Sequence, residues 1–384
     1  MKAQRIFVSP SFAVVVLFVS MVVVAATAVP YSAQSAEAIQ LAATAKTKAP
    51  AAKTASTEVA KPVSDILAFK DGALAPLRES EAVSEHSPFA DGACDFCHKG
   101  NAKNPGPLLK AVNLLCYDCH SEFEEMMTRR AVKHAPATKL CTNCHNPHNS
   151  RNKQLLVYEQ VTLCTTCHTG IKTLLDTATV KHGAMDGAKC SSCHNPHASA
   201  VEKLLIQLPF DMCVKCHSRD GLQDPAGAKL TNFKTLLENN PVWHAPVAGK
   251  DCTACHTPHG GRNFRLLVEP YPAKFYSAYE PENYALCFTC HSSSMVDVPQ
   301  TTTLTGFRDG PVNLHYLHVN KSDRGRTCRA CHEVHASKQA FQIRDSVPFG
   351  DKGWSLKLNF KKTTNGGSCD KTCHSMKDYD RAKK

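Results

Sequence analysis

The sequence predicts a mostly irregular fold with short α-helices, assembled from tandem modules that repeat one local pattern. No long segment has strong helical or strand periodicity. The 22 Pro and 19 Gly residues among 384 interrupt most segments. A pair of cysteines followed directly by a histidine recurs ten times along the chain. Such self-similarity indicates a repeat architecture in which each unit packs on its neighbour.

The ten motifs contain all 20 cysteines of the chain. Nine have the form Cys-x-x-Cys-His, and the tenth has one extra residue between its cysteines. The cysteine pairs are Cys94/Cys97, Cys116/Cys119, Cys141/Cys144, Cys164/Cys167, Cys190/Cys193, Cys213/Cys216, Cys252/Cys255, Cys287/Cys290, Cys328/Cys331 and Cys369/Cys373. The histidines that follow them are His98, His120, His145, His168, His194, His217, His256, His291, His332 and His374.

A Cys-x-x-Cys-His run is typical of covalent haem c, in which two thioethers hold the porphyrin and the histidine binds the iron. Zinc sites and disulfides also use paired cysteines, but neither requires a histidine directly after the second one. We therefore predict ten haems c with these ten histidines as proximal ligands. For the wider tenth motif, the alternative is a structural disulfide beside a chance histidine. The predicted fold is a multihaem cytochrome c of tandem two-haem modules, with the haems forming the core.

The histidine count predicts the second axial ligand of each haem. The chain has 20 histidines, so ten remain for ten distal positions. They are His86, His134, His148, His182, His197, His244, His259, His315, His318 and His335. Methionine is the other common sixth ligand, but the eight methionines are scattered without relation to the motifs. Two histidines on every iron leave no open position, so we expect low-potential electron transfer and no catalytic residues.

The motifs fall into five two-haem modules. Each has a lead histidine, a first motif, usually an extra histidine three residues after the proximal one, and a second motif. The lead histidines are His86, His134, His182 and His244, with His315 and His318 in module five. A Leu-Leu pair recurs before the second motif in modules one to four. The aromatic stretch at 275–284 in module four is expected to pack on haems, with a partner-docking surface as the alternative.

The extra histidines are expected to serve a haem other than their neighbour. Two histidines on opposite faces of one iron have Cα atoms about 13 Å apart, whereas three residues span at most roughly 10.5 Å. Module one has Asn101 in place of the extra histidine, and module five has one histidine too many. Either each module borrows a ligand from the next, or ligands are exchanged between molecules in a head-to-tail polymer. The high effective concentration of a neighbouring module favours the first.

Four segments are predicted along the chain. Residues 1–38 resemble a signal peptide, with Lys2 and Arg5 before an apolar run at 12–29 and possible cleavage sites at 26–28 and 36–38. An uncleaved membrane anchor is the alternative. Residues 39–85 are expected to be an Ala/Lys/Thr/Pro-rich linker, 86–374 the decahaem domain and 375–384 a basic tail. Export also suits an apoprotein with 20 thiols.

The modules, especially Cys-His-Asn-Pro-His at 144–148 and 193–197, resemble the doubled Cys-x-x-Cys-His cytochromes. With the decahaem count and the Gly-Arg-Thr-Cys…Cys-His-Glu-Val-His sequence of 325–335, the chain is similar to periplasmic decahaem cytochromes that insert into outer-membrane porins in metal-respiring bacteria. The resemblance implies electron transfer in the periplasm, or across the outer membrane toward an extracellular acceptor in anaerobic respiration. It implies redox proteins, a porin and an extracellular cytochrome as partners.

Three other functions are alternatives to electron transfer. The formal net charge of +11 could suggest nucleic-acid binding, but the propionates of ten haems would roughly cancel it. A multihaem reductase would need an open iron, often with lysine as proximal ligand, and no Cys-x-x-Cys-Lys motif occurs. The third alternative is that the chain is a subunit of an extracellular cytochrome filament. We expect an exported, monomeric electron carrier that is not an enzyme.

Overall fold

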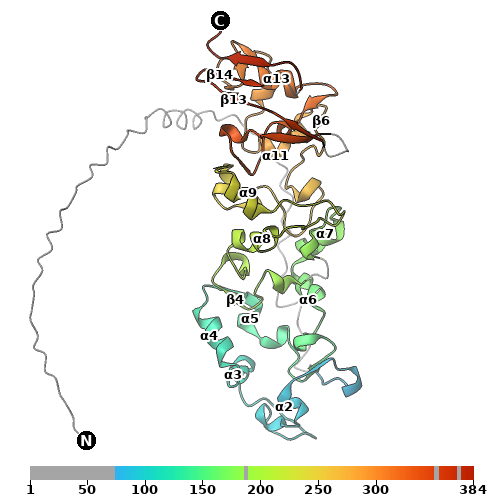
Figure 1. Cartoon of the computed structure of the whole chain (residues 1–384). Helices are drawn as coiled ribbons and strands as arrows, with labels where there is room; N and C mark the ends of the chain where they lie inside the picture. Colours follow the sequence, from blue (N-terminus) through green and yellow to red (C-terminus); the bar gives the residue numbers. More distant parts are fainter. Residues whose placement is uncertain (1–73, 186–188, 350–353, 370–372) are drawn as a thin grey trace, which may run out of the picture. The chain divides into compact units, whose positions relative to one another are not determined.

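The computed structural model describes residues 74–185, 189–349, 354–369 and 373–384. These residues form short helices and short strands joined by loops (Figure 1). The prediction of a mostly irregular fold of tandem modules with short helices is confirmed. The predicted signal peptide and residues 39–73 of the predicted linker lie outside the described residues. Within the described ranges, no helix is long and apolar enough to cross a membrane.

Among the described residues, helices, 3-10 turns and strands follow one another in short pieces, and each sheet has two or three strands. The α-helices are α2 (Ser87–Ala90), α3 (Val112–Tyr117), α4 (Ser121–Arg129), α5 (Ala135–Lys139), α6 (Gln160–Cys167), α7 (Thr169–Thr177), α8 (Pro209–His217), α9 (Phe233–Asn239), α10 (Ala245–Ala248), α11 (Ala285–Phe288), α12 (Ser294–Asp297) and α13 (Leu314–Val319). The 3-10 turns are η5 (Glu79–Glu81), η6 (Cys94–Phe96), η7 (Cys141–Asn143), η8 (Lys153–Leu155), η9 (Gly183–Met185), η10 (Cys190–Ser192), η11 (Glu202–Leu204), η12 (Cys252–Ala254), η13 (Phe264–Leu266), η14 (Pro281–Tyr284), η15 (Cys328–Ala330) and η16 (Ala340–Gln342). The strands are β1 (Ser84–Glu85), β2 (Val132–Lys133), β3 (Asn149–Ser150), β4 (Ala198–Ser199), β5 (Val242–Trp243), β6 (Tyr276–Ser277), β7 (Arg308–Asp309), β8 (Val312–Asn313), β9 (Gly325–Arg326), β10 (Ala336–Ser337), β11 (Ser346–Phe349), β12 (Trp354–Lys357), β13 (Lys361–Lys362), β14 (Gly366–Cys369) and β15 (Lys377–Asp380).

Each first motif folds as a 3-10 turn. In module one, the amide of Cys97 donates to the carbonyl of Cys94 at 3.2 Å, and the amide of His98 donates to the same carbonyl at 2.9 Å. The same two bonds recur in η7, η10, η12 and η15. Because residues three and four apart in a helical turn are neighbours, this turn brings both cysteines and the histidine to one side.

The lead histidines stand at the start of short helices. His86, His134 and His244 precede α2, α5 and α10 as extended N-cap residues, and each helix has a proline in its first turn. Proline there has its backbone angle already set for a helix and gives up no hydrogen bond. Each of these N-cap residues directly follows a strand, β1, β2 or β5, so the histidine is held between two elements.

Two-residue strands join each module to the next. β1 of module one pairs with β3 of module two, and β2 of module two pairs with β4 of module three. An isolated bridge between Val180 and Gly261 joins modules three and four, and β5 pairs with β10 of module five. In each antiparallel pair, the residues next to a lead histidine meet the residues just after an extra histidine. This pairing brings histidines from neighbouring modules together.

Side chains alone provide a small core. Among the described residues, the buried hydrophobic ones are Met127, Ala198, Leu237, Tyr271, Tyr284, Val296, Val319, Ala330, Ala336 and Val347. Four of them, Tyr271, Tyr284, Val296 and Val319, form one cluster. Tyr284 of the aromatic stretch is packed against these side chains, and packing of the stretch on haems stays a prediction. So small a side-chain core suits the prediction that haems supply part of the core.

The C-terminal residues form a sheet of their own. β13, β14 and β15 pair antiparallel in that order, and β14 ends at Cys369 of the tenth motif. The segment predicted as a basic tail contains β15, and the ammonium of Lys383 pairs with Asp309 at 2.8 Å. At the other end, residues 74–85 of the predicted linker include η5 and β1, and the carbonyl of Leu74 accepts the Nδ1–H of His148 at 2.9 Å.

Candidate cofactor sites

Eight pairs of histidine rings face each other with nearly parallel planes. Their ring centres lie 6.0 to 6.4 Å apart and their planes differ by 8° to 20°. The pairs are His86–His120, His98–His148, His134–His168, His145–His197, His182–His217, His194–His259, His244–His291 and His256–His335. Each contains one histidine of a Cys-x-x-Cys-His motif and one of the predicted distal histidines.

This spacing fits an iron between two imidazoles. An imidazole–metal bond is roughly 2 Å long, and a ring nitrogen lies about 1.1 Å from the ring centre for C–N bonds of about 1.33 Å. Two imidazoles bound end-on to one iron therefore have centres about 6.2 Å apart by the same bond lengths. In the described part of the chain, no group of three or more His, Cys, Asp or Glu side chains could hold a metal ion. A pair of imidazoles supplies two ligands, and a porphyrin supplies the other four.

The pairs follow one rule in modules one to four. A lead histidine faces the second motif of its own module, as His86 faces His120. An extra histidine faces the first motif of the preceding module, as His148 faces His98 and His335 faces His256. No extra histidine of a described pair faces the proximal histidine three residues before it. All eight pairs form within one chain.

Module five uses its two lead histidines differently. His315 and His318 lie three residues apart in α13, so their side chains are neighbours on the helix surface. Burial and then the nearby His332 hold the pKa of His315 well below its usual value, at about 4. Burial and several neighbouring positive groups, His374 among them, lower the pKa of His318. His315 therefore lies by the first motif of module five, and His318 lies by the second.

A recurring hydrogen bond to a backbone carbonyl orients the first-motif histidines. Their Nδ1–H groups donate to carbonyls eight or nine residues later, at 2.8 to 3.0 Å. The acceptors are Gly106, Gln154, Lys203, Arg265 and Phe341, and all five have positive φ. A left-handed conformation costs a residue other than glycine on the order of 1–3 kcal/mol. The bond fixes the tautomer, so that Nε2 is left to bind iron.

The lead histidines have carbonyl acceptors in the next module. The Nδ1–H of His86 donates to Pro147 at 2.9 Å, that of His134 to Pro196 at 2.8 Å, and that of His182 to Pro258 at 2.8 Å. Each acceptor directly precedes an extra histidine. A single junction thus fixes two ligands, the lead histidine of one module and the extra histidine of the next.

Burial keeps many of these imidazoles neutral, as metal ligands must be. Removal from water lowers the pKa of His134, and repulsion from a positive charge on His168 lowers it further. Burial is likewise the largest cause of the lowered pKa of His197 and His256. A neutral imidazole whose Nδ1 carries the proton presents a lone pair on Nε2 at physiological pH.

The attachment cysteines of successive motifs are neighbours. Within a module, burial and then the partner sulfur raise the pKa of a second-position cysteine, as Cys119 does for Cys97. Between modules, hydrogen bonding with Cys141 is the largest cause of the raised pKa of Cys116. The cysteine pairs that interact electrostatically within modules are Cys97–Cys119, Cys144–Cys167, Cys193–Cys216, Cys255–Cys290 and Cys331–Cys369. The pairs whose pKa values are shifted most by interaction with each other lie between modules and are Cys116–Cys141, Cys164–Cys190, Cys213–Cys252 and Cys287–Cys328. Every motif is therefore next to the motif before it and the motif after it.

Two phenylalanines that the sequence analysis did not single out lie against the histidines. Phe123 contacts His197 edge-on at 5.1 Å between ring centres and His120 at 6.2 Å. Phe233 does the same with His335 at 4.7 Å and His217 at 6.3 Å. Each phenylalanine follows a second motif and contacts ligands of two different pairs. In the sequence, a phenylalanine follows both His120 and His217, but Phe123 comes three residues later and Phe233 sixteen, so the two do not form a recognisable repeat.

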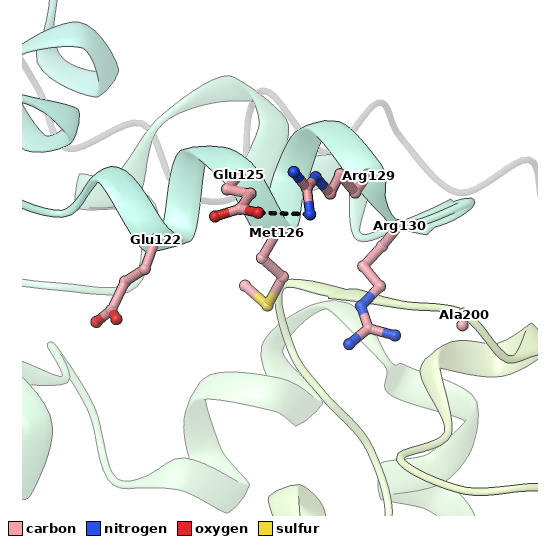
Figure 2. A pocket seen from close by; sticks show the side chains of 6 residues that line it. All are labelled: Glu122, Glu125, Met126, Arg129, Arg130 and Ala200. Carbon is pink, nitrogen blue, oxygen red and sulfur yellow. Dashed lines mark ion pairs between the residues drawn. The ribbon is translucent and has the colours of Figure 1, made fainter. Parts of the chain in front are cut away.

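A cavity beside α4 is separate from these sites. Its volume is about 440 Å³, and it is lined by Glu122, Glu125, Met126, Arg129, Arg130 and Ala200. Figure 2 shows the ion pair of Arg129 with Glu125, whose atoms are 2.6 Å apart. The Sδ of Met126 accepts the amide of Asn195 at 3.8 Å. No cysteine or histidine lines this cavity, so it is not a haem-iron site.

Paired imidazoles beside Cys-x-x-Cys-His motifs are the ligand set expected of haem c, so the arrangement is the one expected of a multihaem c-type cytochrome. The family model described as the doubled CXXCH motif matches residues 86–125, 134–173, 182–222 and 244–296. Each match begins at the lead histidine of one of modules one to four. The comparison with curated proteins gave no match. The doubled motifs support a multihaem cytochrome that binds haem c and works in electron transfer.

Proposed function

We propose that the chain carries ten haems c, each with two axial histidines, and conducts electrons along them. Eight of the ten ligand pairs are the facing histidines described above. The other two are His315 with His332 and His318 with His374, at the haems of module five. When bound, the haem supplies a one-electron iron couple. The protein sets the order, spacing and potential of these groups.

The electrostatic interaction between successive attachment cysteines is the observation that supports the conducting role. A haem c is bonded through its porphyrin edge to each cysteine pair, so neighbouring pairs would bring neighbouring porphyrin edges together. Interactions within modules alternate with interactions between modules from the first motif to the tenth. The order of haems in space then equals their order in the sequence. An electron entering at either end has a continuous path to the other.

The cellular role follows from the resemblance to decahaem cytochromes of metal-respiring bacteria. We propose an exported protein that works in the periplasm or across the outer membrane, toward an extracellular acceptor in anaerobic respiration. Its partners would be redox proteins, with an outer-membrane porin and an extracellular cytochrome as candidates. Fractionation of cells with antibodies to the chain, and co-purification from outer membranes, would test this route.

Two alternatives have weaker support. A filament subunit would be expected to share ligands between molecules, whereas the facing histidines all belong to one chain. A reductase needs an iron with a vacant face, and the ligand pairs supply both faces. We therefore propose a monomeric electron carrier that is not an enzyme.

Intact mass is expected to give ten haem increments over the processed chain, one of them at Cys369 and Cys373. The wider motif is expected to be loaded because its first cysteine lies on β14 and its histidine lies near His318. In a Cys369→Ser/Cys373→Ser variant, the mass should fall by one haem. A wild-type mass with nine haems and two free thiols in the C-terminal peptide would contradict the assignment of the tenth site.

A further inference from the structure

Module five differs from its sister modules at two positions that face each other. The first position is the residue directly after the proximal histidine of the first motif. It is Asn146 in module two, Asn195 in module three and Thr257 in module four, but Glu333 in module five. The residue whose amide donates to the second cysteine's carbonyl is Val157, Ile206 or Val268 in those modules, but Arg344 in module five. A carboxylate and a guanidinium thus appear together in one module.

The carboxylate of Glu333 makes a contact that its counterparts do not make. The side-chain oxygens of Asn146 and Asn195 accept the backbone amides of His148 and His197, each at 3.0 Å. The carboxylate of Glu333 instead accepts the Nδ1–H of the His335 ring at 3.3 Å. Among the described residues of the eight facing pairs, the other Nδ1 hydrogen bonds go to backbone carbonyls. The Nδ1 of His315 bonds the hydroxyl of Thr305, which is neutral.

Arg344 holds this carboxylate in place. One guanidinium nitrogen of Arg344 lies 2.9 Å from the second oxygen of Glu333, and its Nε–H donates to the carbonyl of His332 at 2.9 Å. The side chain of Arg344 is 11% exposed and that of Glu333 is 22% exposed. Because the group is largely removed from water, its charges are screened less than surface charges are.

The carboxylate of Glu333 faces two groups that favour its ionised form, the guanidinium of Arg344 at 2.9 Å and the Nδ1–H of His335 at 3.3 Å. An ionised carboxylate on the far nitrogen of a metal-bound imidazole makes that imidazole a stronger electron donor. A stronger donor and a nearby negative charge both stabilise ferric over ferrous iron.

We propose that Glu333 is a positioning residue that lowers the reduction potential of the haem between His256 and His335, and that Arg344 limits the effect. The inference rests on the proposed ligation of that haem by His335. The haem belongs to module four, while the tuning pair belongs to module five. The reduction potential of the haems then changes at the junction between modules four and five. The junctions formed by the extra histidines of modules two and three lack this carboxylate.

The first test is a potentiometric titration of the haem-loaded Glu333→Gln variant. The amplitude of one haem in ten should move to higher potential, with the others unmoved. We expect the ferrous-to-ferric ratio of that haem at fixed potential to rise about tenfold, which is about 59 mV for a one-electron couple. The matched control is Glu202→Gln, which removes an exposed carboxylate at the start of η11, and it should leave the titration unchanged.

The Glu333→Gln variant leaves the largely buried guanidinium of Arg344 without its carboxylate partner, and a second variant removes both charges. Glu333→Asn/Arg344→Val restores the pattern of module two and leaves no unpaired charge. Its shifted haem should titrate above wild type and below Glu333→Gln, because Arg344 also raises the potential. If both variants titrate like wild type, or if several haems shift together in each, the proposal is wrong.

The His335→Met variant identifies the haem. Methionine keeps a sixth ligand but has no N–H to give Glu333, so adding Glu333→Gln should then produce little further shift. An undiminished shift in this background would assign the effect to the haem of His332 and overturn the proposal. Low-temperature EPR of His335→Met should itself lose one bis-histidine signal. If it does not, the ligation by His335 fails, which is a different result from an inert Glu333.

Discussion

Replacing His197 with alanine is expected to convert one haem in ten from low-spin to high-spin. The ring of His197 faces that of His145 at 6.0 Å between centres, so its loss opens one face of the iron held by His145. Alanine leaves a space lined by Phe123 at that position, where a small ligand such as carbon monoxide can bind. Resonance Raman spectra and carbon monoxide titration of the haem-loaded variant should both report one open site per chain.

The matched variant is His197→Met, which retains a sixth ligand. It should remain low-spin and bind no carbon monoxide, while the potential of one haem rises because a thioether favours ferrous iron more than imidazole does. If His197→Ala remained fully low-spin, the pairing of His197 with His145 would be wrong. A change confined to the haem at His194, three residues before His197, would be equally damaging, because it would reverse the pairing rule.

Removing a haem from the middle of the chain is expected to slow electron transfer from end to end by several orders of magnitude. Cys213 interacts with Cys252, and Cys216 interacts electrostatically with Cys193, so the sixth haem is expected to connect the fifth and the seventh. In a Cys213→Ser/Cys216→Ser variant, the electron must cross a gap as wide as a missing porphyrin. Stopped-flow reduction from one end should then show a fast group of haems and a slow group.

The control is Cys94→Ser/Cys97→Ser, which removes the first haem. This variant shortens the path without dividing it, so its remaining haems should be reduced in one fast group. Equally fast reduction of all haems in the Cys213→Ser/Cys216→Ser variant would indicate a branched or compact arrangement and contradict a linear order.

The cofactor chemistry could be predicted from the sequence because a covalent haem requires a local motif. Two cysteines and a histidine within five residues must lie on one side of a single turn, and the 3-10 turns of the first motifs do this. The sparse secondary structure could also be predicted from the missing periodicity. Both properties depend on residues close together in the chain.

The pairing of distal with proximal histidines depends on residues far apart. The partner of His98 is His148, and it is set by the pairing of β1 with β3. Two-residue strands have no periodicity that a sequence pattern could reveal. The three-residue spacing excludes His148 from the haem of His145, but it leaves both a neighbouring module and another molecule as sources of the distal ligand. The antiparallel register of β1 and β3 supports the neighbouring module of the same chain.

Other features had a signal that was not interpreted. The recurring Leu-Leu pairs mark the loops whose positive-φ residues supply the carbonyls for the first-motif histidines, and Leu155, Leu204 and Leu266 themselves have positive φ. The repeat predicted common packing, but a left-handed leucine is too rare to expect from sequence. Glu333 likewise lies in the Cys-His-Glu-Val-His sequence of 331–335, but its proposed effect on a haem potential depends on Arg344, eleven residues later.

The central claim is that a single chain supplies both axial histidines to each of ten haems. It is tested most directly by near-infrared magnetic circular dichroism and EPR of the oxidised, haem-loaded monomer isolated by size exclusion. The account predicts ten low-spin haems per chain, all with bis-histidine charge-transfer bands. A high-spin or methionine-ligated haem in the monomer, or bis-histidine ligation that appears only when chains associate, would contradict it.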